Sequence, residues 1–274
     1  MSKQITAQQV VDRIKDQLGT SWKESKTDVF CAGNPGTVVT GIATSFTPSI
    51  EVLQKAADSG KNLIITQQPA YYLETEEYMA NDPAFEFKKT LIEKNKLVVW
   101  RFDENWGARE VDGQLLGLTK ALGWDEYHIQ NSNSGTEPYN PKNKYFNLPE
   151  TSLREMVTYF KERLNIPGLR VEGDPEIKVK KAALSHGMFK LTELQEFLSD
   201  PEVDLIVISE AIEWESCEYF RDFLTWKGRN KAMILIGREA SEDPGYGEAA
   251  TWMKTFISEV PVAWIPANEP FWVP

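Results

Sequence analysis

Histidine and cysteine are scarce in this 274-residue sequence, which contains two of each: His128, His186, Cys31 and Cys217. Zinc and iron sites normally recruit imidazole or thiolate ligands, and neither pair shows the close spacing of such a site. The distant cysteines favour reduced thiols, and the N-terminus has no apolar signal segment, so we expect a cytoplasmic protein. A metal ion in this chain would have to be held almost entirely by carboxylates.

Several other signatures of function are also missing. No run of about 18 apolar residues indicates a membrane helix. No P-loop and no G-x-G-x-x-G motif after a strand indicates a nucleotide site, and no G-x-S-x-G elbow indicates a serine hydrolase. The formal net charge of −11 argues against binding to nucleic acid or to anionic membranes. We therefore expect a globular protein whose partners are neither nucleic acid nor membranes.

Short apolar runs alternate with amphipathic segments along the chain. The runs VVTGIATS, NLIIT, KLVVWRF, DLIVI and KAMILI are typical of buried strands, and helical patterns lie between them. Residues 4–18 predict a helix capped by Thr6, and SFTPSIEVLQKAAD predicts a helix with Pro48 in its first turn. This alternation indicates the α/β class, and its recurrence in the second half indicates two related lobes.

Polar side chains follow four of the predicted strands. Gln67 and Gln68 stand before Pro69, which cannot donate to a sheet and should end the strand. The other three segments are the tip 101–105, the pair Ser209-Glu210 and the GREASE segment 237–242. Because ligands bind at the carboxyl ends of strands in open α/β sheets, these segments could converge in one cleft. The alternative is that strand ends are polar because they reach solvent, and both interpretations stay open.

Two residues that could carry chemistry have no partner in sequence. Ser185 and His186 are adjacent, which does not make a nucleophile–base pair, and we interpret His186 as a loop residue. Cys217 lies on a predicted helix without a nearby base and is interpreted as a core residue. The sequence alone therefore offers no catalytic pair.

The segment VVTGIATSFTPSIEVLQKAADSGKNLIITQQPAYY resembles the NIF-three-like proteins (NGG-interacting-factor-three-like), whose second strand ends in His-His-Pro or His-Glu-Pro. LIGREASEDPGYGEAATWM is similar to the family's Gly-His-x-x-(S/T)-Glu signature. Ile208-Ser209-Glu210 is similar to its (T/S)-Gly-Glu motif, and VVWRF to its metal-binding strand. The resemblance implies two intertwined α/β repeats with mixed β-sheets flanked by helices. We expect repeats at 1–125 and 149–274, joined by a loop at 126–148.

The resemblance also implies a dinuclear metal site in a cleft between the repeats and assembly into a toroidal hexamer. The family's activity is poorly defined: a GTP-cyclohydrolase-like label exists, and metal-dependent hydrolysis is the commoner suggestion. In this chain Gln67 and Gln68 stand at the paired ligand positions, and Arg238 stands at the histidine of the second signature. The strand tip offers Asp103 and Glu104. Of the expected ligands, only Glu242 matches plainly.

Two alternative functions follow from these differences between the chain and the family's metal-binding residues. The first is a metal-free or weakly metal-binding member whose polar cleft binds a small polar ligand or serves in assembly, without a cofactor. In this reading Arg238 neutralises Glu242 or Asp103 through a bidentate contact, and Ser209, Glu210 and Glu239 contribute to ligand binding. The alternative is a metal-dependent hydrolase acting on phosphoester or amide bonds, with oxygen ligands for Mg, Mn, Ca or Zn. Its metal ligands would be at most Asp103, Glu104 and Glu242.

Overall fold

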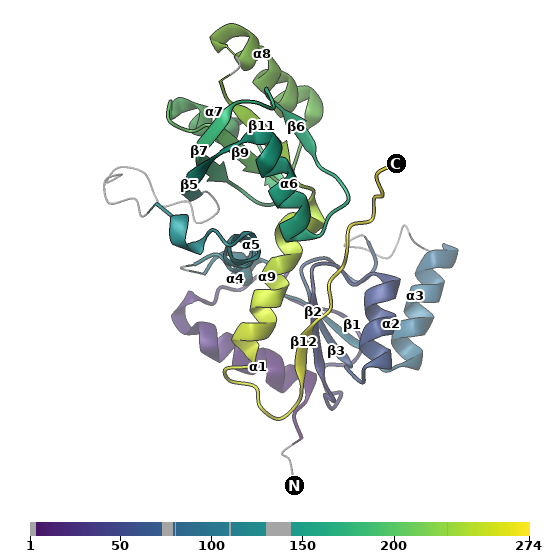
Figure 1. Ribbon diagram of the computed structural model, residues 1–274. Coiled ribbons are helices and arrows are strands. Elements are labelled where there is room, and N and C mark those ends of the chain that lie inside the picture. Colours follow the sequence, from purple (N-terminus) through teal and green to yellow (C-terminus); the bar gives the residue numbers. More distant parts are fainter. Residues whose placement is uncertain (1–3, 73–78, 80, 110, 130–143, 229) are drawn as a thin grey trace. The chain divides into compact units, whose positions relative to one another are not determined.

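The computed structural model describes residues 4–72, 79, 81–109, 111–129, 144–228 and 230–274 (Figure 1). The chain forms two compact units. Unit 1 comprises Met1–Gln114 and Asp243–Ala267, and unit 2 comprises Leu115–Glu242 and Asn268–Pro274. Each unit therefore takes residues from two separate stretches of the chain, as an intertwined fold requires.

Unit 1 is built on a five-stranded mixed sheet. Its strands lie in the order β1 (Phe30–Ala32), β4 (Val98–Arg101), β3 (Leu63–Thr66), β2 (Ile42–Ser45) and β12 (Val262–Trp264). The last four strands run parallel, and β1 pairs antiparallel with β4. As predicted, β3 ends before the glutamine pair and Pro69. Strand β1 lies in a polar segment for which the sequence predicts only a turn.

Helices cover both faces of the unit 1 sheet. Helix α1 (Ala7–Leu18) and the later part of α9 (Arg238–Met253) pack on one face, and α2 (Ile50–Asp58) and α3 (Pro83–Lys94) on the other. The alternation of side chains along β3 explains this: Leu63 and Ile65 contact the first pair of helices, and Ile64 contacts the second.

The helix starts test two sequence predictions in unit 1. Thr6 caps α1, as predicted, and accepts a hydrogen bond from the backbone N–H of Gln9. The predicted place of Pro48 in the first turn of α2 is wrong. Ser49 is the N-cap, because its hydroxyl accepts from the N–H of Val52, so the proline precedes the helix.

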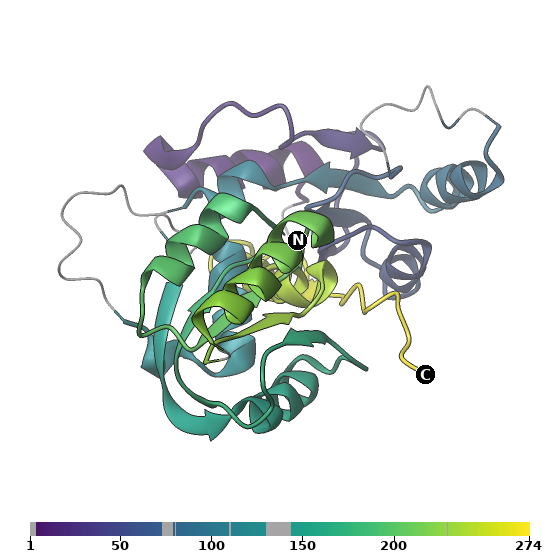
Figure 2. The ribbon, with the colours of Figure 1, turned by 90° about the horizontal axis from the view of Figure 1, so that it is seen from above.

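Unit 2 repeats this architecture. Its sheet has the order β5 (Lys144–Ser152), β7 (Lys178–Leu184), β9 (Leu205–Ile208), β11 (Ala232–Leu235) and β6 (Arg170–Glu172). The three central strands run parallel, and both edge strands pair antiparallel. Figure 2 shows α7 (Leu191–Ser199) and α8 (Glu218–Lys227) on one face and α6 (Leu153–Leu164) on the other, where α5 (Gly113–Leu122) also packs.

Short elements complete the described chain. They are η1 (Gly19–Ser21), α4 (Glu104–Gly107), η3 (Asp125–Tyr127), β8 (Met188–Phe189), β10 (Glu210–Ala211) and the π-helix η4 (Glu213–Cys217). Of the predicted connecting loop, residues 144–148 belong to β5, and 130–143 lie outside the described residues. The α/β class with mixed, helix-flanked sheets is confirmed, and the repeat boundaries stay a prediction. Among the described helices, none is long and apolar enough to cross a membrane.

Lys88 is an unusual part of the unit 1 core. This lysine lies on α3 and is 1% exposed, and its Nζ lies 4.3 Å from the centroid of the Tyr72 ring. Within the described part of the chain, no carboxylate forms an ion pair with it. Burial lowers the pKa of Lys88 from 10.5 to about 8, because the charged form loses its hydration.

Replacing Lys88 by methionine should therefore stabilise the protein by about 2 kcal/mol at pH 7. The lowered pKa corresponds to a penalty of about 3 kcal/mol, and loss of the Tyr72 contact offsets about 1. The penalty is complete below the folded pKa and disappears as pH rises from about 8 to 10.5. Urea unfolding at pH 7 and 9.5 should show the advantage of Lys88→Met shrinking. A constant advantage, or the same trend in the half-buried control Lys89→Met, would contradict this reading.

Candidate functional site

The carboxyl ends of three parallel strands in unit 2 bring polar residues together. The N–H of Ser185 donates to the carbonyl of Val207 at 2.9 Å, so sheet pairing continues past the end of β7. The N–H of Gly237 donates to the carbonyl of Ser209 at 3.0 Å beyond β11. These bonds hold the strand ends side by side, and the residues that follow them form one cluster, the unit 2 cluster: His186, Ser209, Glu210, Arg238, Glu239 and Glu242.

Arg238 is the central cation of the unit 2 cluster. Its Nε lies 2.9 Å from Oε2 of Glu242, and its Nη1 lies 3.0 Å from Oε1 of Glu210. The Glu242 side chain is only 2% exposed, whereas that of Arg238 is 32% exposed. The contact expected between Arg238 and Glu242 is therefore present. It is not bidentate, however, because the guanidinium is shared between two carboxylates.

His186 is another partner of Glu242. Its Nδ1 lies 3.1 Å from Oε1 of the buried carboxylate. Burial alone would raise the pKa of Glu242, but the hydrogen bond from His186 and the charge of Arg238 outweigh it and hold that pKa below its usual value. An ionised carboxylate can only accept, so Nδ1 carries the donated proton. His186 is a loop residue, as interpreted from the sequence, because it lies just after the end of β7; the sequence did not predict its contact with Glu242. The sequence feature that indicates a place in the cluster is that His186 comes directly after the apolar end of a strand.

The remaining members of the unit 2 cluster lie around this core. Ser209 is buried, and its hydroxyl donates to the carbonyl of Gly187. Glu239 stands in the first turn of α9 and is partly buried; burial raises its pKa, and the nearby charges of Glu269 and Glu210 act in the same direction. The cluster thus combines several carboxylates with one permanent cation. The ligand-binding roles predicted for Ser209, Glu210 and Glu239 stay predictions.

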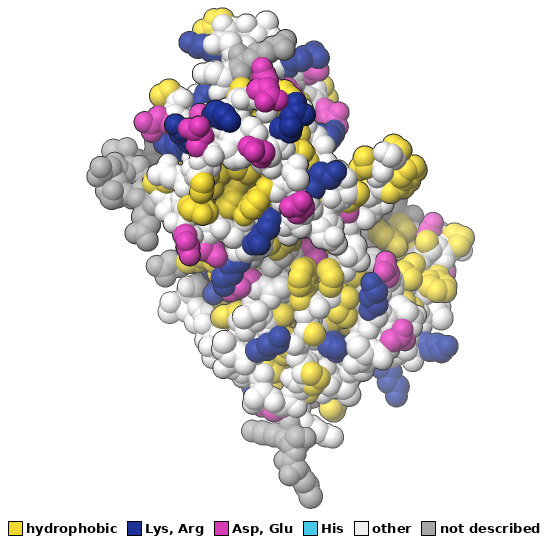
Figure 3. Space-filling model, viewed as in Figure 1, with side chains coloured by type: hydrophobic (Ala, Val, Ile, Leu, Met, Phe, Trp, Pro, Cys, Tyr) yellow, Lys and Arg dark blue, Asp and Glu magenta, His cyan; other side chains and the backbone are white. Residues whose placement is uncertain are grey.

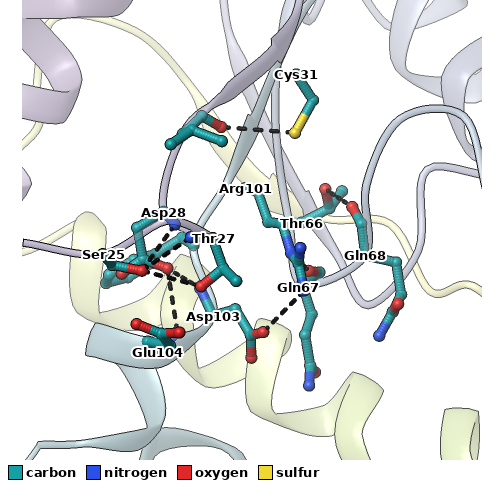
Figure 4. Close-up of polar contacts among 12 residues, drawn as sticks. Ser25, Thr27, Asp28, Cys31, Thr66, Gln67, Gln68, Arg101, Asp103 and Glu104 are labelled. Atoms are coloured by element: carbon teal, nitrogen blue, oxygen red, sulfur yellow. Dashed lines mark hydrogen bonds and ion pairs between the residues drawn. The ribbon is translucent and has the colours of Figure 1, made fainter. Parts of the chain in front are cut away.

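In unit 1, the glutamine pair follows the end of β3, and hydrogen bonds from its backbone hold it in place. The N–H groups of Gln67 and Gln68 both donate to the carbonyl of Phe46 at 3.1 Å. Gln67 is 4% exposed, and Gln68 is half-buried. In Figure 4 the two side chains extend from the strand end toward the same side. Their primary amides can donate and accept hydrogen bonds but are weak ligands for a metal ion.

Arg101, at the end of β4, organises the unit 1 strand tip. Its Nε donates to the backbone carbonyl of Gln67 at 2.7 Å, and its Nη2 lies 3.1 Å from Oδ2 of Asp103 (Figure 4). Glu104 is exposed and forms the first turn of α4. The two predicted acidic residues of the tip therefore differ. Asp103 is ion-paired to an arginine of its own unit, and Glu104 faces solvent.

Asp28, which the sequence analysis does not predict as a site residue, supports this tip from a segment before β1. Its Oδ1 accepts from the N–H of Asp103 and Glu104 at 2.7 and 3.0 Å. Its Oδ2 accepts from the N–H and the side-chain amide of Asn105 at 3.0 and 2.7 Å. The carboxylate satisfies the first donors of α4 and fixes the direction in which the tip leaves β4. No local motif marks it, because its partners lie about 75 residues later in the sequence.

These donor sets do not fit the dinuclear metal site that the resemblance implies. Among the residues that the structure describes, no three His, Cys, Asp or Glu side chains form a group that could hold a metal ion. Arg238 is ion-paired with both Glu242 and Glu210, and its guanidinium stays charged because it cannot be deprotonated in a protein. Asp103 is paired in the same way with Arg101. Two dications need several free anionic or imidazole ligands, and arginine repels them.

Comparisons with known proteins identify the fold. The Duf34/NIF3 (NGG1p interacting factor 3) family matches residues 5–262, and no curated protein matches the chain. Staphylococcus aureus protein SA1388 is 16% identical over 98% of this chain and 99% of its own, with a TM-score of 0.73. A Bacillus cereus protein related to NIF3 is 14% identical over 98% and 99%, also with a TM-score of 0.73. Reduced HcgD from Methanocaldococcus jannaschii is 11% identical over 96% and 99%, with a TM-score of 0.64. The chain belongs to the Duf34/NIF3 family.

Proposed function

We propose that this protein is a metal-independent member of its family, and that the unit 2 cluster binds a small polar ligand. The observation that carries the proposal is the pair of ion pairs from Arg238 to Glu242 and Glu210. The guanidinium supplies the positive charge that a metal ion would otherwise supply to these carboxylates. The cluster then needs no cation from solution to balance Glu242.

The charges of the cluster favour one class of ligand. Glu210, Glu239 and Glu242 outnumber the single guanidinium of Arg238, and Glu269 lies near enough to raise the pKa of Glu239. A phosphate or carboxylate ligand would meet net repulsion there. A neutral or cationic molecule with hydroxyl or amine donors would find carboxylate acceptors. We therefore propose a hydroxyl- or amine-bearing ligand rather than an anion.

A thermal-melting series tests this proposal. Manganese chloride and inorganic phosphate should leave the melting temperature of the wild-type chain unchanged, and ethanolamine should raise it in a saturable way. In Arg238→His, an imidazole would stand beside Glu242 and His186, and manganese should now raise the melting temperature. At a concentration about 100 times Kd, the gain is about 2.7 kcal/mol, or roughly 5 to 10 °C for a chain of this size. Saturable stabilisation of the wild type by manganese would instead support the metal-dependent hydrolase.

Assembly into a homo-oligomer, a hexamer by resemblance to the family, and a cytoplasmic location belong to the same proposal. The fold supplies only an analogy for the oligomeric state. Light scattering at micromolar concentration tests the assembly directly. A monomer at that concentration would contradict the proposed homo-oligomer.

A further inference from the structure

A cavity lies in unit 2, built from segments that the unit 2 cluster does not use. It has a volume of about 340 Å³, at the lower end of the range for small-ligand sites. Its walls include Trp124, Tyr127 and Tyr159, the apolar side chains of Leu148 and Met156, and Glu155. Figure 3 shows hydrophobic side chains gathered on this face between β5 and α6. We call this cavity the aromatic pocket.

The local sequence explains why a cavity forms here. The pairing of β5 with β7 breaks between Asn147 and Thr151, where the register shifts. Pro149 lies in this break and has no N–H to donate to a ladder. Leu148 and Pro149 belong to β5, but at this irregularity they line the pocket. Ser152 then caps α6, which turns the chain and sets Glu155 and Tyr159 along one side.

The aromatic walls are held in place by their neighbours. The Trp124 ring lies 5.2 Å from the ring of Phe146 and 5.4 Å from that of Phe160, between centroids. The Tyr159 hydroxyl donates to the carbonyl of Leu122. The N–H of Tyr127 donates to the carbonyl of Trp124 at 3.0 Å, closing the η3 turn. Trp124 is buried at 2% exposure, and Tyr127 and Tyr159 stand on a hydrogen-bonded turn and on helix α6, so a ligand would not have to order these walls.

Glu155 adds a fixed negative charge at the edge of the pocket. Its Oε2 accepts from the N–H of Ser152 at 2.8 Å, and from the hydroxyls of Ser152 and Thr151 at 2.7 and 3.0 Å. These bonds lower its pKa to about 2, so the carboxylate is ionised at any physiological pH. The guanidinium carbon of Arg163 lies 6.0 Å from the Tyr159 centroid, which is within the range of a cation–π contact. The positive end of α6 offsets part of the carboxylate charge.

From this geometry we propose that the aromatic pocket binds a small organic cation with a methylated ammonium head. Aromatic faces attract cations through their quadrupole, and the partly exposed rings of Tyr127 and Tyr159 can offer such faces. A primary ammonium would lose its hydration against the apolar Leu148 and Met156 side chains, whereas a methylated head is weakly hydrated and fills apolar space. Glu155 selects against anions. The site is separate from the unit 2 cluster and does not depend on the function proposed for it.

Isothermal titration of the full chain with choline tests the proposal, with 3,3-dimethyl-1-butanol as the uncharged molecule of the same shape. Choline should bind saturably and at least about tenfold more tightly than the alcohol, since the cation–π and carboxylate terms are lost in the neutral analogue. Equal affinities for choline and the alcohol would mean that the pocket recognises only apolar shape. A lack of saturable choline binding would mean that the pocket is not a cation site. Either result overturns the proposal.

Two variants locate the binding. Glu155→Gln removes the charge but keeps the reciprocal cap of α6, because glutamine also serves at that position. It should weaken choline about fivefold and leave the alcohol unchanged. Tyr127→Leu removes one wall from the short η3 turn and should weaken choline about tenfold. Circular dichroism checks that both variants are folded. Unchanged choline affinity in both folded variants would overturn the assignment to this pocket.

Discussion

Replacing Arg238 by methionine should lower the free energy of unfolding by about 3 kcal/mol. The substitution leaves Glu242 buried without one of its ion-pair partners, and removing one member of a buried ion pair costs about 3–5 kcal/mol. The lower end applies because the Arg238 side chain is 32% exposed. Urea denaturation at pH 7 measures the change.

The same substitution at an exposed ion pair supplies the control. Arg221 pairs with Glu218 on α8, where the two side chains are 68% and 48% exposed. Arg221→Met should change stability by less than about 0.5 kcal/mol, because exposed pairs contribute little. Equal losses in the two variants would mean that Arg238 does not balance a buried charge.

The pH dependence of the Arg238→Met variant follows from the pKa of Glu242. In the wild type this pKa lies below its usual value, so the stability it contributes is present above about pH 4.5 and is lost as pH falls through the folded pKa. Without Arg238 the folded pKa moves up, toward or above the unfolded value. The fall in stability on acidification should then be smaller in the variant than in the wild type.

Replacing Asp28 by alanine should cost a similar amount, about 3 kcal/mol. Four hydrogen bonds at the start of α4 end on this carboxylate, and the residue is 7% exposed. Leaving buried N–H groups without acceptors costs about 1–3 kcal/mol each, although water can reach some of them once the side chain is gone. The strand tip that carries Asp103 should lose its fixed direction.

Two further variants make this result specific. Asp28→Asn retains one acceptor oxygen and should lose about half as much stability. Asp12→Ala, on the exposed side of α1, should change stability by less than about 0.5 kcal/mol. Amide hydrogen exchange should show faster exchange at 103–105 in Asp28→Ala. Unchanged protection there would contradict the capping role of Asp28.

The central strands could be predicted from the sequence because a strand that is buried on both faces consists mostly of apolar residues. β9 and β11 are continuous apolar runs and β3 is apolar up to Thr66, and the apolar side chains face one helical layer or the other. Two of the edge strands, β1 and β5, could not be predicted in the same way. β1 and β5 are short or interrupted, and β5 carries Asn147 and Pro149, which are typical of loops.

The candidate site was predictable where strand ends supply it. Ser209, Glu210 and Arg238 follow central strands, and the parallel order of β7, β9 and β11 brings them together. His186 follows the same rule, but its partner Glu242 stands 56 residues away, so no sequence pattern predicts their contact. Asp28 and the aromatic pocket depend on contacts between segments that no sequence pattern links. The meeting of all four polar segments in one cleft stays a prediction.

The most direct test of the account is elemental analysis of the protein purified without chelator and without an affinity nickel column. If Arg238 replaces a metal ion as the partner of Glu242, zinc, iron and manganese should each be far below one ion per chain. The Arg238→His variant, prepared in the same way, should retain more metal than the wild type. Near-stoichiometric metal in the wild-type protein would contradict the account, because the carboxylates that Arg238 holds would then be metal ligands.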